Sequence, residues 1–135
     1  MEGEFIKSIV REAEELLSRD FAVYVKGPEG DLVTDADYLV ERFLIEKIQA
    51  EYPDFAIISE EFNPNAVMSE NCFIIDPIDG TKNFANGLPL WGIQVACRKN
   101  GETIASVINL PALKEFYFAD ESGAYLNGEK ISVRE

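Results

Sequence analysis

Two closely spaced carboxylates, Asp76 and Asp79, directly follow an apolar run at residues 72–75. They lie three residues apart and Pro77 stiffens the link, so both side chains could converge on one side of a tight loop. The segment could also be an ordinary turn, because Asp, Pro and Gly are common turn residues. An acidic residue that follows a buried strand nevertheless lies at the end of a sheet, where ligands often bind.

A second acidic pair, Glu60 and Glu61, follows the apolar run at residues 56–59. Alone, this pair is explained by a solvated strand end. Together with Asp76 and Asp79, Glu60 provides a third carboxylate, and three like charges this close repel one another unless a cation offsets them. A site built only from oxygen ligands suits Mg2+ or Mn2+ rather than zinc.

Gly80 and Thr81 follow the aspartates and add groups that could hold an anion. Gly80 allows the backbone to approach a ligand closely. Thr81 supplies a hydroxyl and is predicted to begin a helical turn, whose N–H groups could bind a phosphate. A metal held by carboxylates beside an anion cradle is what hydrolysis of a phosphate monoester needs, because the metal polarises the phosphoryl oxygens and activates a bound water.

The composition narrows the chemistry further. The sequence has no histidine, which excludes Ser-His-Asp sites, Cys-His sites and His-ligated zinc centres. With 12 basic and 25 acidic residues the formal net charge is −13, which argues against binding to a nucleic-acid polymer, since that needs clustered Lys and Arg. Cys72 and Cys97 lack metal-ligand spacing and are expected to be buried small apolar residues.

Two helices are predicted to position these residues. The spacing of apolar residues over 5–17 predicts an amphipathic helix that ends near Arg19. After a β-prone run at 21–25, the chain is broken at residues 27–30. A second helix opens at Thr34, a good N-cap, with Asp37 in a capping-box position, and ends at Pro53.

Strands dominate the rest of the chain. They are predicted at 56–59 and 72–75, then at 90–99, 103–109 and 115–119, with a last pair flanking 127–128. Asn100-Gly101 and Asn127-Gly128 are two-residue hairpin signals. Two helices followed by a meander of strands predict an α+β fold, in which both N-terminal helices pack on one face of a mostly antiparallel sheet.

The segment 76–84, Asp-Pro-Ile-Asp-Gly-Thr-Lys-Asn-Phe, resembles the DP[IL]DGTxNF signature of the inositol monophosphatase family. Residues 31–37 are similar to its DLVTxxD motif, 59–61 to its [GS]EE motif, and 123–128 to its GAxxNG hairpin. The family includes archaeal-type fructose-1,6-bisphosphatases and is related to 3′(2′),5′-bisphosphate nucleotidases. The resemblance covers nearly the whole chain and implies the N-terminal half of the layered sugar-phosphatase fold.

The resemblance also implies metal ligands. Glu60, Asp76 and the carbonyl of Ile78 match the first metal site, and Asp76 and Asp79 match the second. Glu61 is a further possible site residue, and so is Lys26, which falls where several relatives have a basic residue. Two or three Mg2+ ions are implied, with Mn2+ able to substitute.

The resemblance assigns the catalytic work to Glu60, Thr81 and Asp37. Thr81 matches the threonine that helps to orient the attacking water, with Asp37 hydrogen-bonded behind it. The backbone amides of Gly80 and Thr81 match the phosphate cradle.

The activity implied is metal-dependent hydrolysis of a small phosphate monoester, inhibited by lithium. Inositol monophosphate is the first substrate expected, with fructose 1,6-bisphosphate and 3′(2′),5′-bisphosphate nucleotides as alternatives. A non-catalytic module that binds cations or oligomerises is the other alternative. A cytoplasmic location without membrane contact is expected, since no apolar run approaches the roughly 18 residues of a membrane span and residues 1–5 lack the pattern of a signal peptide. A homodimer is also expected, because a half of the family fold would expose an apolar patch and an open sheet edge.

Chains of the family are roughly twice as long as this one. Residues 1–135 are therefore expected to form the N-terminal metal- and phosphate-binding portion, with the C-terminal half absent. In the family that half supplies a further metal-binding Asp from a Trp-Asp motif, whereas Trp91 here is followed by Gly92. The chain alone is expected to be weakly active or inactive.

Overall fold

The computed structural model describes residues 1–17, 23–26, 31–59, 61–62 and 67–134. Within these residues it contains three α-helices, α1 (Glu2–Glu15), α2 (Asp35–Glu51) and α3 (Thr81–Ala85), and one 3-10 turn, η1 (Pro111–Leu113). The strands are β1 (Val23–Lys26), β2 (Asp31–Thr34), β3 (Ala56–Ser59), β4 (Cys72–Asp79), β5 (Gly92–Lys99), β6 (Glu102–Leu110), β7 (Glu115–Asp120), β8 (Gly123–Leu126) and β9 (Glu129–Ile131).

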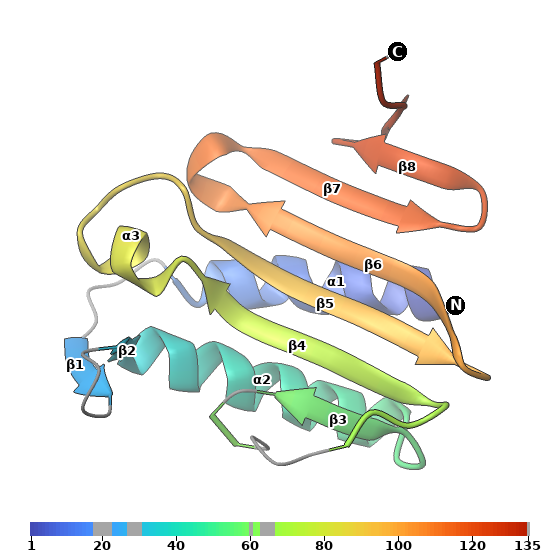
Figure 1. Cartoon of the computed structure of the whole chain (residues 1–135), viewed down its shortest axis with the longest axis horizontal. Helices are drawn as coiled ribbons and strands as arrows, with labels where there is room; N and C mark the ends of the chain where they lie inside the picture. The colour runs from blue at the N-terminus through green and yellow to red at the C-terminus, as the bar shows by residue number, and fades with distance from the viewer. Residues whose placement is uncertain (18–22, 27–30, 60, 63–66, 135) are drawn as a thin grey trace.

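Strands β3 to β9 form one sheet whose spatial order is the order of the chain. β3 and β4 are parallel, and every later neighbouring pair is antiparallel. α1 packs on β5 and β6 and α2 packs on β4, so both helices cover the same face of the sheet (Figure 1). The predicted α+β class is confirmed, and β1 and β2 form a separate antiparallel hairpin.

The hydrophobic core lies between the two helices and the covered face of the sheet. Helix α1 buries residues at the i, i+3, i+4 and i+7 positions of one stripe, namely Ile6, Ile9, Val10 and Ala13. From the sheet, the ring of Phe73 is fully buried and its centroid lies 5.2 Å from that of Tyr52 and 5.4 Å from that of Phe55. Along β6, successive side chains alternate between the covered and the uncovered face, since Val107 is 1% exposed and Ile108 is 42% exposed.

Both predicted two-residue hairpins are confirmed. Asn100 and Gly101 have φ values of 53° and 81°, and Asn127 and Gly128 have φ values of 50° and 85°. Two successive residues with positive φ are the geometry of a type I′ turn, whose twist matches that of the flanking strands. These turns fix the register of β5 with β6 and of β8 with β9.

Two predictions about the first third of the chain need correction. α1 ends at Glu15 rather than near Arg19, because the N–H groups of Leu16 and Leu17 bond to carbonyls three residues back and close the helix with a tight turn. The strand β2 was missed because its four residues carry no clear apolar alternation. Arg19 and the breakers at 27–30 lie outside the described residues.

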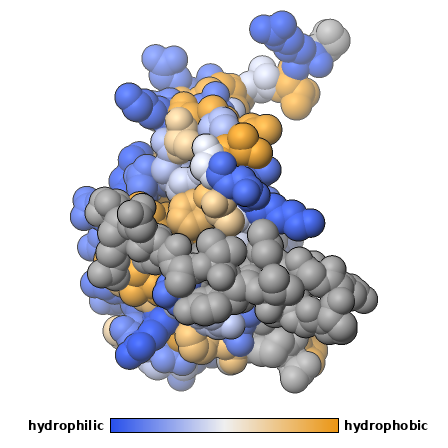
Figure 2. Space-filling model, turned by 90° about the vertical axis from the view of Figure 1, so that its left-hand side faces the viewer, coloured by the Kyte–Doolittle hydropathy of each residue, from blue (hydrophilic) through white to orange (hydrophobic). Residues whose placement is uncertain are grey.

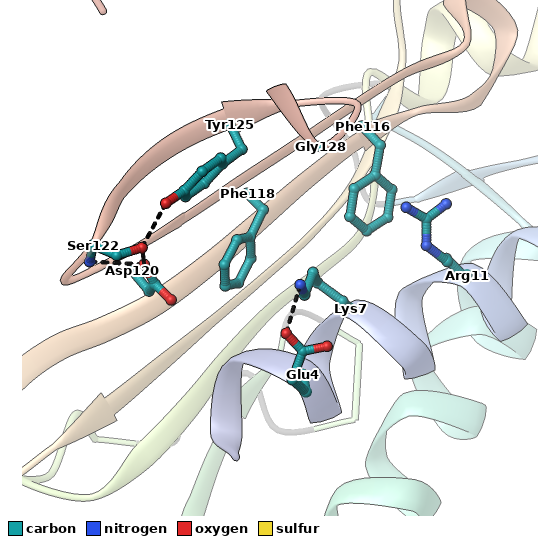
Figure 3. Close-up of a pocket in the computed structure, with 9 residues that line it drawn as sticks. All are labelled: Glu4, Lys7, Arg11, Phe116, Phe118, Asp120, Ser122, Tyr125 and Gly128. Carbon is teal, nitrogen blue, oxygen red and sulfur yellow. Dashed lines mark hydrogen bonds and ion pairs between the residues drawn. The ribbon is translucent and has the colours of Figure 1, made fainter. Parts of the chain in front are cut away.

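A hollow of about 310 Å³ lies where α1 meets the β7–β8 hairpin (Figure 3). Lys7 Nζ lies 4.4 Å from the ring centroid of Phe118, and the guanidinium of Arg11 lies 3.9 Å from that of Phe116. Lys7 also pairs with Glu4 at 2.7 Å. These cation–π contacts link α1 to β7. No predicted site residue lines the hollow.

The one-sided core predicts a contrast between two substitutions. Phe73→Ala is expected to lower the free energy of unfolding by about 3–5 kcal/mol, because it removes a fully buried ring. Ile108→Ala, on the uncovered face, is expected to change it by less than about 1 kcal/mol. Urea denaturation followed by circular dichroism measures both, and equal losses would contradict the assignment of the two faces.

Candidate active site

Asp76 and Asp79 lie within strand β4 and not in a turn after it, which corrects the sequence-based prediction. The strand runs from Cys72 to Asp79. Asp76 pairs with Gln94 and Asp79 pairs with Gly92, so three steps along β4 match two along β5. This register shift is a β-bulge, and a bulge accommodates Pro77, which has no N–H to donate to the ladder.

The bulge brings both aspartates to the same face of the sheet. Asp76 follows Ile75, which faces the core, and therefore points away from the helices. Without the extra residue, Asp79 would point to the opposite face. Instead the side-chain amide of Gln94, the residue paired with Asp76, donates to Asp79 Oδ2 at 2.8 Å. Gln94 is thus the cross-strand partner of Asp76 and the hydrogen-bond donor to Asp79.

Sequence reasoning missed Gln94. It is a polar residue on a strand that is otherwise mostly apolar, and no motif marks it. Only the pairing of β4 with β5 places it opposite Asp76 and within hydrogen-bonding distance of Asp79. The hydrogen bond from its amide to Oδ2 orients the Asp79 carboxylate.

Gly80 connects the strand to α3 in a conformation that other residues rarely adopt. Its φ is 85°, and a Cβ at this position would lie 2.7 Å from the carbonyl oxygen of Leu90 and 3.3 Å from Trp91 Cα. The loop after α3 therefore packs directly against the Gly80 backbone. The rings of Phe84 and Trp91 meet edge to face beside it, with centroids 4.8 Å apart.

Thr81 begins α3, as predicted, and joins it to α2. Its hydroxyl lies 3.1 Å from Asp37 Oδ1 and 3.1 Å from the carbonyl oxygen of Ile78, and it donates its one proton to these two acceptors. Asp37 is only 4% exposed. The hydrogen bond implied by the family resemblance is thus present, while the catalytic roles of Thr81 and Asp37 remain predictions.

Glu41 lies one turn after Asp37 on α2 and is fully buried. Its carboxylate accepts the backbone N–H of Glu61 at 3.0 Å and also the N–H of Phe62. Burial raises the pKa of the Glu41 carboxyl above its ordinary value, and the two N–H groups oppose that shift. Sequence reasoning missed this residue, because a Glu within a helix usually lies on the solvated face.

Several predicted site residues are only partly placed. Glu60 lies outside the described residues. Glu61 follows it in a turn, and Lys26 is the last residue of β1, paired with Asp31. In the described part of the chain, no three His, Cys, Asp or Glu side chains lie close enough together to hold a metal.

The donor atoms that are described still fit a hard cation. The carboxylates of Asp76 and Asp79 and the carbonyl of Ile78 offer oxygen only, as Mg2+ prefers.

The end of the molecule that carries α3 and the end of β4 faces the viewer in Figure 2, where its described surface mixes hydrophilic and hydrophobic residues. Leu88 and Leu90, which follow α3, are 52% and 64% exposed.

The two cysteines are buried and free, as predicted. Burial raises the pKa of the Cys97 thiol to about 11, so it stays protonated at neutral pH and is a poor nucleophile. Among the described residues, no helix combines the length and apolar character needed to cross a membrane.

Comparison with known proteins gives one consistent result. A sequence model of the inositol monophosphatase family matches residues 4–135. A histidinol-phosphatase from Chlorobaculum parvum is 41% identical over 102 residues, covering 75% of this chain and 39% of the relative. A fructose-1,6-bisphosphatase/inositol-1-monophosphatase from Thermotoga maritima is 43% identical over 108 residues, covering 78% of this chain and 41% of the relative.

Solved structures agree in fold. The IMPase from Thermotoga maritima superposes with a TM-score of 0.88 at 37% identity, covering 98% of this chain and 53% of that chain. The chain thus spans about half the length of this structure and about two fifths of the two curated relatives.

The link between α2 and α3 predicts a stability difference between two variants of Thr81. Thr81→Val keeps the shape but removes the hydroxyl donor, so the free energy of unfolding is expected to fall by about 1–3 kcal/mol. Thr81→Ser keeps the donor and is expected to cost less than half as much. Guanidinium denaturation of both variants measures this, and equal costs would show that the hydrogen bond to Asp37 contributes nothing.

Proposed function

The chain belongs to the inositol monophosphatase family, and from this we propose that residues 76–81 form the phosphate- and metal-binding segment of a phosphate monoester hydrolase. The observation that carries the proposal is the bulge in β4, which turns Asp76 and Asp79 to one face immediately before Gly80 and Thr81. Carboxylates and backbone amides are thereby brought within one short segment.

The proposed metal ligands are Asp76, Asp79, the carbonyl of Ile78 and Glu60. Mg2+ bound there would polarise the phosphoryl oxygens and lower the pKa of a bound water. Two or three ions, with Mn2+ as a substitute, are part of the proposal. A geometric reason supports Asp76 as the shared ligand, since it lies inside the strand beside the paired Gln94 and is less exposed than Asp79.

Thr81 is proposed to orient the attacking water. Its hydroxyl oxygen keeps a lone pair free to accept a hydrogen bond from the water, because its own proton is directed toward Asp37 and Ile78. The backbone N–H of Thr81 is the first of α3 and has no partner within the helix, so it is a suitable donor to a phosphate oxygen. The N–H of Gly80 is proposed as the second donor.

The substrate class is a small phosphorylated polyol, sugar or nucleotide. Inositol monophosphate remains the first candidate, with fructose 1,6-bisphosphate and 3′(2′),5′-bisphosphate nucleotides as alternatives. The relatives named above add histidinol phosphate to the compounds worth testing. A cytoplasmic location is part of the same proposal.

Metal binding is tested by titrating Mn2+ into the chain by calorimetry. Asp76→Asn is expected to weaken binding more than Asp79→Asn, because Asp76 is the proposed ligand of both ions. Asp120→Asn is a matched control, since it makes the same change in net charge at the hollow near α1. If all three variants bind Mn2+ equally well, the metal centre is wrongly assigned.

Phosphate release with and without Mg2+, from this chain and from a version extended to the length of its relatives, tests the activity on the four candidate substrates. In the longer version, stimulation by Mg2+, loss in Asp76→Asn and inhibition by lithium are expected. In Thr81→Val of that version, kcat is expected to fall by about 10²–10⁴-fold with Mn2+ affinity kept, the scale of assistance to proton transfer. Binding of Mn2+ by both versions without phosphate release from either would favour the non-catalytic, cation-binding module.

A homodimer is also proposed. The face of the sheet opposite the helices carries Ile108, which is 42% exposed, and β9 is an edge strand with open hydrogen-bonding groups. Light scattering is expected to give a mass about twice the 15.1 kDa of one chain. A monomer at all concentrations would contradict this.

A further inference from the structure

Helix α2 holds two segments of the proposed site through two acidic side chains. Asp37 accepts the hydroxyl of Thr81, which follows β4. Glu41 accepts the backbone N–H groups of Glu61 and Phe62, which follow β3. Residues four apart on a helix lie on the same face, so one rigid face of α2 touches the chain after each of the two parallel strands.

The contact made by Glu41 is specific in its geometry. Both carboxylate oxygens lie 3.0 Å from the N–H nitrogen of Glu61, and the second oxygen also accepts from Phe62. The carboxylate is acceptor-only and takes two neighbouring backbone donors. Such charge-assisted bonds are stronger than neutral ones and fix the direction of the main chain as it leaves β3.

Burying this carboxylate is costly, and a core role does not require it. Glu41 has no exposed surface, and its neighbours on the same helix, Val40 and Leu44, are fully buried apolar residues. An apolar residue would fill the space without desolvating a charge. A carboxylate at this position has a different use, which is to accept hydrogen bonds from two backbone N–H groups. Both N–H groups belong to the acidic segment that follows β3.

We infer that Glu41 is a positioning residue, which fixes the main chain at Glu61 and Phe62 and thereby sets the direction of the acidic segment that follows β3. This rests on the proposed function. Ser59 is fixed on one side by its pairing with Ile75, and Glu61 on the other side by Glu41. The proposed ligand Glu60 is the residue between these two in the sequence.

The test compares Glu41→Gln with Leu44→Ala, using Mn2+ calorimetry and amide hydrogen exchange under conditions where all proteins are folded by circular dichroism. In Glu41→Gln an amide NH2 replaces one acceptor oxygen and meets a backbone donor. Mn2+ affinity is expected to fall by about 10–100-fold, the range for partners that orient metal ligands. Exchange at Glu61 and Phe62 is expected to accelerate relative to the amides of β4 and β5.

Leu44→Ala controls for lost stability, since Leu44 is a fully buried residue of α2 in the hydrophobic core cluster. It is expected to lower the melting temperature while leaving the Mn2+ affinity within about twofold. If Glu41→Gln does not fold, Glu41→Asp is used instead, because it keeps the charge and shortens the side chain by one methylene. The same ranking of Mn2+ affinities is expected.

Each remaining outcome overturns the inference. Equal weakening of Mn2+ binding in the Glu41 and Leu44 variants would show a general effect of stability. Unchanged Mn2+ binding in the Glu41 variant, with or without faster exchange, would show that the hydrogen bonds of Glu41 to Glu61 and Phe62 do not position the metal ligands. The proposed function would stand in that case. If the wild-type chain binds no Mn2+, the metal centre and the inference fail together.

Discussion

A β-strand directs alternate side chains to opposite faces, so two residues three positions apart normally face opposite ways. The proposed site at the end of β4 depends on breaking that rule once. Between Asp76 and Asp79, β4 contains one residue more than the paired segment of β5. This bulge includes Pro77, which has no N–H to donate to the neighbouring strand. Both carboxylates then face away from the helices, and Gly80 and Thr81 follow directly into α3.

The rest of the fold holds this irregular segment in place. Gln94 approaches it from β5, the loop carrying Leu90 and Trp91 packs against Gly80, and α2 reaches it through Asp37. Asp37 and Glu41 are both buried, so their hydrogen bonds act away from water, where electrostatic interactions are stronger and a lost partner costs more. The geometry of the segment is therefore set by tertiary contacts more than by its own turn residues.

Local signals in the sequence predicted a large part of this structure. Strand β3 and the start of α3 at Thr81 lie where the pattern placed them, and both Asn-Gly turns have the expected backbone. Gln94 and Glu41 could not be predicted, because each acts across a strand or helix contact that only the folded register creates. Asp76 was found by its motif, but its place inside a bulged strand depends on pairing with β5.

The packing of Trp91 has a practical consequence. It is the only tryptophan of the chain, and it lies edge to face on Phe84 of α3 while its backbone abuts Gly80. Indole emission responds to the polarity and rigidity of its surroundings. The intrinsic fluorescence of the protein, excited selectively at the red edge of tryptophan absorption, thus comes from one spot next to the bulge. Titrations can follow that spot optically without any attached label.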